Sequence, residues 1–246
     1  MLPSISVVIP AFNEAAANAA AVQLALDAGV AEVVVADGGS EDGTATIAID
    51  AGARVVRAAR GRGTQLNAVS AASHGDVLLF VHADGRLPRE AGHQIEAALT
   101  DPAVVGGNFR IWFGTGEHAR FLAAFYDVIR QLTLYYGDSA IWCGRADFEA
   151  VGGFPPYPLM EDLKLVHRLR CRGQMAYRDG PVIALPRRWE QGGLVRTWTS
   201  WLVIQRSTPR TFHRGGWRGC TSTFSSRSCH AADEPRSRLQ NAGDGS

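Results

Sequence analysis

Short apolar runs alternate with alanine-rich or amphipathic segments along the first hundred residues. The apolar runs predict strands buried on both faces, as in a parallel sheet, and the segments between them predict helices. Expected strands cover Ser4–Pro10, Glu32–Ala36, Ala53–Val56 and Asp76–Val81, and expected helices cover Glu14–Asp27, Thr44–Ala51, Gln65–Ser73 and Pro88–Leu99. Strand and helix in this order form βαβ units with right-handed crossovers, so the predicted fold class is α/β.

The second half of the chain has a less regular pattern. Extended structure is expected at Val104–Phe113, Ala176–Tyr177 and Val182–Leu185, helices at His118–Tyr136 and Glu161–Cys171, and a loop over residues 137–154. From residue 206 on, Ser, Arg, Gly and Thr dominate and no period persists. We therefore expect one domain over residues 1–205, followed by a poorly ordered tail over 206–246.

Composition and charge exclude several classes of protein. The chain has 246 residues, 46% hydrophobic and 20% charged, which is ordinary for a soluble globular protein. A net charge of +1 predicts no nucleic-acid partner. The four cysteines form no CxxC pair, which indicates free thiols in a reducing cytosol. No signal peptide is evident and no apolar run approaches the ~20 residues of a membrane span, so a cytoplasmic location is expected.

Polar residues follow three of the predicted strands directly. Asn13 and Glu14 come after the first strand, Asp37 after the second, and His82 and Asp84 after the fourth. The carboxyl ends of parallel strands meet at one edge of a sheet, where α/β proteins bind ligands. Each of these residues alone could be a turn or cap residue, and Asn13 is a candidate helix cap. Asp37 and Asp84 together favour a shared site.

Four segments carry a resemblance to a known family. They are ISVVIPAFNEA, EVVVADGGSEDGT, RGRGTQLNAVSAASHGDVLLFVHAD and GGFPPYPLMEDLKLVHRLRCRG, in that order. The chain resembles family-2 glycosyltransferases of the GT-A fold over roughly Ile5–Trp189. It is most similar to a small bacterial subgroup with HAD in place of D-x-D. The resemblance implies a mostly parallel sheet flanked by helices, with residues 1–100 binding a nucleotide sugar and residues 101–205 forming the acceptor and catalytic half.

The resemblance also implies roles for individual residues in the first half. Contacts with the nucleotide sugar are expected from Pro10, Glu14, Asp37, Arg60, Gln65, His82 and Asp84. Asp84 matches the last Asp of D-x-D and would hold Mg²⁺ or Mn²⁺, because a departing diphosphate requires a hard cation with oxygen ligands. For Arg60 and Arg62, contact with phosphate and ordinary exposure on the surface both stay open.

In the second half, Asp162 matches the family's general base, with Glu161 beside it. Inverting transfer requires one carboxylate to take the proton of the acceptor hydroxyl. The alternative is an acidic first turn that interacts with the helix dipole. Asp138 is a candidate for acceptor binding.

Two positions depart from the family pattern. His82 replaces the first Asp of D-x-D, so a carboxylate near the metal is lost. Leu185 stands at the Gln position of the Q-x-x-R-W motif of processive members, which favours transfer of a single sugar. Arg188 and Trp189 are candidates for contact with diphosphate and acceptor, or else a buried Trp with an Arg that reaches to solvent.

The predicted function is therefore metal-dependent, inverting transfer of one hexose from a UDP- or GDP-linked donor to a hydroxyl acceptor, either small or lipid-linked. A nucleotide-sugar-binding module without turnover is the alternative. A Rossmann dehydrogenase is excluded because the first strand–helix turn, PAFNE, has no G-x-G-x-x-G. Leu194–Gln205 is amphipathic and would either pack on the domain or touch a membrane surface.

Overall fold

The computed structural model describes residues 2–114, 123–124, 126, 137–157 and 160–184. These residues lie in the first of two compact units, Met1–Thr208, and the second unit, Pro209–Ser246, is outside the described part of the chain. Also outside it are Arg188, Trp189, Leu194–Gln205, residues 206–246 and most of the expected helix His118–Tyr136. The predictions made for these residues stay predictions.

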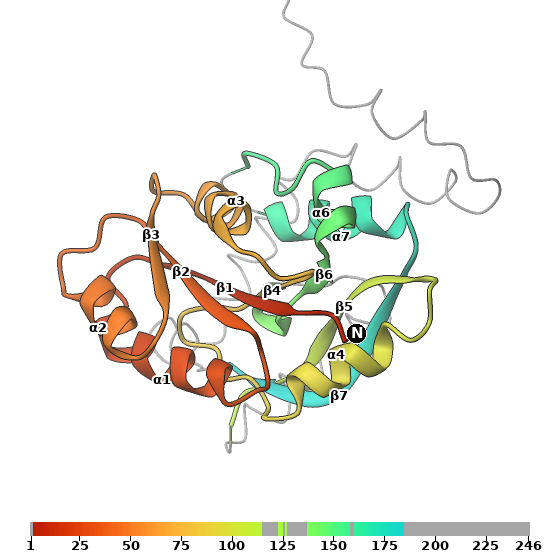
Figure 1. Ribbon diagram of the computed structural model, residues 1–246, viewed down its shortest axis with the longest axis horizontal. Coiled ribbons are helices and arrows are strands. Elements are labelled where there is room, and N and C mark those ends of the chain that lie inside the picture. The colour runs from red at the N-terminus through yellow and green to blue at the C-terminus, as the bar shows by residue number, and fades with distance from the viewer. Residues whose placement is uncertain (1, 115–122, 125, 127–136, 158–159, 185–246) are drawn as a thin grey trace, which may run out of the picture. The chain divides into compact units, whose positions relative to one another are not determined.

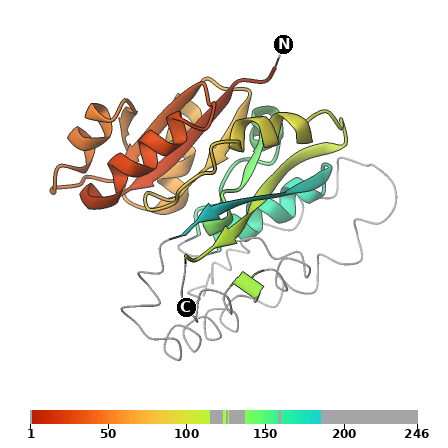
Figure 2. The ribbon, with the colours of Figure 1, turned by 90° about the horizontal axis from the view of Figure 1, so that it is seen from below.

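Seven strands form one mixed sheet in the order β3-β2-β1-β4-β6-β5-β7 (Figure 1). They are β1 (Ile5–Ala11), β2 (Glu32–Asp37), β3 (Arg54–Arg57), β4 (Val77–Phe80), β5 (Val104–Trp112), β6 (Trp142–Gly144) and β7 (Gln174–Ile183). β1 is parallel to β2 and β4, β2 to β3, and β5 to β7, which lie side by side in Figure 2. Only β6 runs antiparallel to its neighbours, β4 and β5. The predicted α/β class with a mostly parallel sheet is confirmed.

Helices cover both faces of the sheet. In Figure 1, α1 (Ala15–Leu26), α2 (Thr44–Asp50) and α4 (Ala91–Ala98) lie below it, and α3 (Arg62–Ala72), α6 (Arg145–Ala150) and α7 (Glu161–Arg170) lie above it. Because side chains alternate along a strand, Val7 and Ile9 of β1 pack with the first set and Val8 packs with the second. Two apolar cores result, one on each face.

Alanine spacing explains how α1 approaches the sheet. Ala17, Ala21 and Ala25 recur every four residues and are buried, so one small-residue stripe faces the strands. The helix begins after Glu14 rather than at a cap on Asn13, which instead adopts a left-handed conformation with φ of 54°. The prediction that Asn13 caps this helix is therefore wrong.

Residues 137–154 do not form the loop predicted for them. They contain the short helix η1 (Gly137–Ser139), the strand β6 and the helix α6. β6 has only three residues, and it is stabilised by pairing with β4 on one side and β5 on the other. Likewise, the two extended pieces expected near residues 176 and 182 form one strand, β7, because both pair with β5.

β4 ends in the middle of the sheet, between β1 and β6. All four of its residues are buried, and the backbone N–H of Val81 still donates to the carbonyl of Val8 (3.0 Å). The chain then turns, with the N–H of Gly85 donating to the carbonyl of His82 (2.9 Å). His82 and Asp84 thus follow a rigid strand at the carboxyl edge of the sheet.

Candidate functional site

The loops that follow β1 and β2 are hydrogen-bonded to each other. The N–H of Asn13 donates to Ser40 Oγ (2.9 Å), and the N–H of Glu41 donates to Asn13 Oδ1 (3.1 Å). The N–H of Glu14 donates to Thr44 Oγ1 (2.9 Å). Asn13 therefore holds the two loops together, and Glu14 immediately precedes α1.

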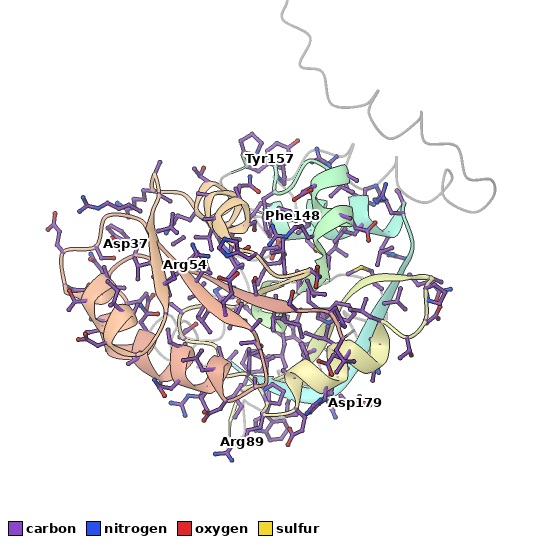
Figure 3. All side chains as sticks on the ribbon, in the orientation of Figure 1. Asp37, Arg54, Arg89, Phe148, Tyr157 and Asp179 are labelled. Carbon is purple, nitrogen blue, oxygen red and sulfur yellow. The ribbon has the colours of Figure 1, made fainter. Side chains whose placement is uncertain are left out.

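Asp37, the last residue of β2, lies in this pair of loops. Its side chain is buried, with 3% of the residue exposed, and its carboxylate accepts from the N–H of Ser40. Asp37 is labelled in Figure 3. A carboxylate has about four lone-pair sites, so Asp37 can accept further hydrogen bonds from a ligand.

Gln65 of α3 joins the ends of the two strands from inside. Its Nε2 donates to the carbonyls of Ala11 and Ala36, both at 2.9 Å, and the residue is 5% exposed. A Cβ at Gly38 would lie 2.9 Å from the same nitrogen, so glycine allows this close approach. Gln65 thus binds the backbone of both strands, a role that the sequence pattern does not predict. Its predicted contact with the nucleotide sugar stays a prediction.

Two further residues, Pro10 and Arg60, are predicted to contact the nucleotide sugar. Pro10 lies in β1 in register with Ala36. The guanidinium of Arg60 is 4.0 Å from the centre of the Phe12 ring, a cation–π contact. Neither observation tests their predicted contact with the nucleotide sugar.

Arg62, His82 and Asp138 form the centre of the candidate site. Arg62 Nη2 lies 2.6 Å from His82 Nε2, and the same ring nitrogen lies 3.0 Å from Asp138 Oδ1. A neutral ring protonated on Nδ1 accepts from Arg62, whereas a proton on Nε2 would be donated to Asp138. One nitrogen of His82 therefore faces a cation and an anion at once.

Arg62 also reaches Glu161 at the start of α7. Its Nε is 3.2 Å from Glu161 Oε1, but neither atom has a hydrogen-bond partner among the described residues. Glu161 is 3% exposed. Burial raises the pKa of Glu161, the nearby Arg62 opposes that rise, and the charge of Asp162 adds to it. Arg62 is thus partly buried among polar partners and is not an ordinary exposed arginine.

Asp162 is held in place by backbone groups. The N–H of Gly137 donates to its Oδ2 (2.6 Å), the N–H of Leu163 donates to its Oδ1 (2.8 Å), and the residue is 7% exposed. A Cβ at Gly137 would lie 2.0 Å from Arg62 Nη2 and 3.2 Å from Asp162 Oδ2. The absence of a side chain at Gly137 therefore lets the guanidinium and the carboxylate share one space.

The helix α3 connects the loops after β1 and β2 with the segment that leads into α7. Asn67 forms two hydrogen bonds of 2.9 Å with the backbone of Phe154, one as donor and one as acceptor. The ring of Phe154 packs edge-on against Phe80 of β4, with 4.9 Å between ring centres. Asn67 and Gln65 are two residues apart, so one helix fixes the strand ends and the segment that leads into α7.

Asp84 is the candidate metal ligand. It lies in the turn after β4, is partly exposed, and has no hydrogen bond or ion pair within the described chain. Those residues contain no group of three or more His, Cys, Asp or Glu that could hold a metal ion. A single accessible carboxylate still fits Mg²⁺ or Mn²⁺, because Mg²⁺ is bound through one or two carboxylates together with substrate phosphates.

The structure therefore brings some of the predicted site residues together and places others apart from them. His82, Asp138, Glu161 and Asp162 come together around Arg62 and Gly137, whereas Glu14 and Asp37 lie in the neighbouring loops. Asn67 was not anticipated, because a single Asn in a helix carries no signal of its partner 87 residues away. No helix in the described residues is long and apolar enough to cross a membrane.

Comparisons with known proteins point in one direction. The model of the family "Glycosyl transferase family 2" matches residues 6–148, more than half of the chain. No sequence of the curated proteins matches.

Three solved structures are similar in fold. A mannosyltransferase from Pyrobaculum calidifontis, in complex with GDP-Man and Mn²⁺, is 20% identical with a TM-score of 0.62, over 82% of this chain and 65% of that one. S. aureus TarS is 16% identical with a TM-score of 0.60, over 76% and 62%. Glucosyl-3-phosphoglycerate synthase from Mycobacterium tuberculosis, with Mn²⁺, UDP and glucosyl-3-phosphoglycerate, is 22% identical with a TM-score of 0.57, over 83% and 80%. The chain thus spans less than two thirds of the first two proteins.

Proposed function

The chain belongs to glycosyl transferase family 2, and from that premise we propose that it transfers one sugar from a nucleoside-diphosphate sugar to a hydroxyl acceptor, with inversion at the anomeric carbon. The match covers β1 to β4 and continues into α6. The proposal therefore combines family membership with the geometry of the carboxylates at the start of α7.

The observation that carries the proposal is the placement of Asp162. Two backbone N–H groups orient its carboxylate, yet each oxygen keeps a further lone pair with which to accept from a substrate hydroxyl. These two N–H groups fix the carboxylate in one orientation, as a general base requires. Asp162 fits that role better than Glu161, whose pKa is raised by burial.

The reaction follows from these positions. The acceptor oxygen attacks the anomeric carbon from the face opposite the diphosphate while its proton passes to Asp162. The bond between the anomeric carbon and the diphosphate oxygen breaks, and that oxygen leaves with the electron pair. Arg62, fixed between His82 and Glu161, would supply a positive charge on the side of the departing diphosphate. Asp37 would accept from the nucleobase.

Asp84 would hold the divalent cation. When bound, Mg²⁺ or Mn²⁺ would neutralise charge on the departing diphosphate. Two of the structural relatives contain Mn²⁺, one with GDP-Man and one with UDP, which supports a nucleotide-linked donor without choosing between the two bases. Leu185 at the Gln position of the processive motif supports transfer of a single sugar.

Binding calorimetry and a donor-turnover assay test the proposal together. The purified chain is titrated with UDP-glucose and with GDP-mannose, each with and without Mn²⁺, and release of UDP or GDP is then followed. We expect one donor to bind in a Mn²⁺-dependent way and to be turned over, and we expect NMR of the product to show an inverted anomeric configuration.

Asp84→Asn separates the metal from the rest of the site. It should abolish Mn²⁺-dependent binding of the donor, whereas Asp27→Asn, which changes an exposed carboxylate at the end of α1, should preserve it. Donor binding without turnover, in the wild type and in Asp162→Asn alike, would favour a binding module and contradict the proposed enzyme.

A further inference from the structure

The short helix η1 connects three parts of the candidate site through consecutive residues. Gly137 donates its N–H to Asp162 of α7, Asp138 lies 3.0 Å from His82 after β4, and Ser139 Oγ accepts from Asn108 Nδ2 of β5 at 3.0 Å. Two of these contacts involve residues already placed in the site. The third, between Ser139 and Asn108, has no role in the proposed reaction.

Asn108 is a buried amide with one atom unsatisfied. The residue is 3% exposed, and its Oδ1 has no hydrogen-bond partner. Its neighbour Phe109 packs in the core below the sheet, on the side of α1 and α4, so Asn108 faces the opposite side, where α7 carries Glu161 and Asp162. A buried polar atom without a partner is costly, and nearly all such atoms in folded proteins are paired.

The position of Asn108 along the sheet brings it to the level of the site. β6 pairs with β5 at Gly107 and Trp142, and β6 follows directly after Ser139, Ala140 and Ile141. The N–H of Phe80, the last residue of β4, donates to the carbonyl of Ile141. Asn108 therefore lies level with Phe80 at the carboxyl end of β4, with the residues that lead into β6 between them.

We propose that Asn108 and Ser139 form the floor of an acceptor subsite for a polyhydroxylated acceptor, a sugar or a polyol. One acceptor hydroxyl donates to Asn108 Oδ1, and a neighbouring hydroxyl is thereby held near Asp162, which takes its proton. Asp138, whose side chain is 41% exposed, forms the solvent side of the subsite. The inference rests on the proposed function and adds the chemical class of the acceptor and the residues that select it.

A second buried asparagine provides the control. Asn18 of α1 is also fully buried, donates through Nδ2 to the carbonyl of Thr44 (3.3 Å), and has an unsatisfied Oδ1. It packs between α1 and α2, which cover the face of the sheet opposite α7. An unsatisfied oxygen alone is thus not evidence of a ligand, and the distinguishing feature of Asn108 is its connection to η1.

The experiment measures how the enzyme divides the donor sugar between water and an added acceptor. Whichever of UDP-glucose and GDP-mannose is hydrolysed serves as donor, and glycerol, methyl α-glucoside and methyl α-mannoside serve as acceptor probes at high concentration. The variants are Asn108→Leu combined with Ser139→Ala, which removes both hydrogen-bonding groups, and Asn18→Leu as the matched control.

We expect wild type to transfer to at least one probe, and the double variant to lower the ratio of transfer to hydrolysis by about tenfold or more, since a site that hydrogen-bonds a substrate hydroxyl depends strongly on that bond. Its donor hydrolysis should stay within about twofold, and Tm is measured in parallel to detect any loss of folding. Asn18→Leu should leave the ratio unchanged.

Two results would overturn the subsite: hydrolysis by wild type without transfer to any probe, or an unchanged ratio in the double variant. Neither result would affect the proposed function, which depends on donor turnover. Absence of donor hydrolysis in the wild type would instead refute the proposed function, and the subsite with it.

Discussion

Both ends of the sheet carry buried or half-buried carboxylates, but the hydrogen bonds that these carboxylates make differ between the two ends. At the amino end, Glu32 accepts from Ser6 Oγ (2.6 Å), the N–H of His74 (2.5 Å) and Arg54 Nη2 (2.8 Å); Arg54 is labelled in Figure 3. Burial alone would raise the pKa of Glu32, but these hydrogen bonds and the charge of Arg54 overcome it and lower the pKa to about 2. This carboxylate is fully paired.

At the carboxyl end the corresponding pair is incomplete. Glu161 lies 3.2 Å from Arg62 without a hydrogen bond, and burial raises its pKa. One nitrogen of His82 is shared between Arg62 and Asp138. From this difference we infer that the amino-end groups stabilise the fold. The incomplete pairing at the carboxyl end is what we expect if those groups bind a substrate, as we propose.

Asp162→Asn should have the largest effect on activity. The amide has one oxygen, cannot take a proton from the acceptor, and should lower turnover by about 10²–10⁴-fold, the usual contribution of a general base. Steady-state release of the nucleoside diphosphate, with Tm measured in parallel, checks this. An activity near that of wild type would remove Asp162 from the mechanism.

Gly137→Ala should have the second largest effect on activity. The added Cβ would lie 2.0 Å from Arg62 Nη2, and φ at Gly137 is not in the left-handed region, so the guanidinium moves while the backbone need not. A displacement of about 1 Å in an active site can cost roughly 10²-fold in rate. Gly144→Ala is the matched control, because its Cβ would be 3.2 Å from Asp147 Oδ2 and outside the site.

If Gly137→Ala proves fully active, the arrangement of Arg62 between His82 and Glu161 has no bearing on turnover. If it loses activity together with more than a few degrees of Tm, the glycine is required for folding, and the contrast between the two ends of the sheet weakens.

Glu32→Gln should affect stability and not turnover. Loss of its charge-assisted hydrogen bonds should lower the free energy of unfolding by about 1–3 kcal/mol at pH 7. Because the pKa of Glu32 is lowered from 4.5 to about 2 on folding, this stabilisation is present above about pH 4.5 and is lost as the pH falls toward 2. Urea unfolding of both proteins between pH 7 and pH 2 should show the difference shrinking over that range. A difference that does not depend on pH would contradict this role of the carboxylate.

His74→Ala should have the smallest effect. Its backbone N–H makes the bond to Glu32, whereas its ring is 81% exposed and 3.5 Å from the carboxylate. We expect a change within about 0.5 kcal/mol in the free energy of unfolding, as for most surface substitutions. A larger loss, measured by the same urea titration, would show that the ring contributes to the amino-end cluster.

The sequence predicted the strands and helices from Ile5 to Phe80 well, because apolar runs mark these strands and alanine-rich or amphipathic segments mark the helices between them. β6 was missed because three residues carry no period and its stability comes from β4 and β5. Of the candidate site, the resemblance assigned roles to Asp84 and Asp162, and these roles stay predictions. The pairing of Arg62 with Glu161, and of Asn108 with Ser139, depends on tertiary contacts that no local pattern encodes.

The most direct test measures two quantities on two variants. Donor turnover and the free energy of unfolding are determined for Asp162→Asn and Glu32→Gln beside the wild type, with the nucleotide sugar that the wild type hydrolyses. We predict that Asp162→Asn loses turnover per folded molecule by at least about 10²-fold, and that Glu32→Gln loses stability with turnover per folded molecule unchanged. Turnover that survives in Asp162→Asn, or that is lost in Glu32→Gln at full folding, would contradict it.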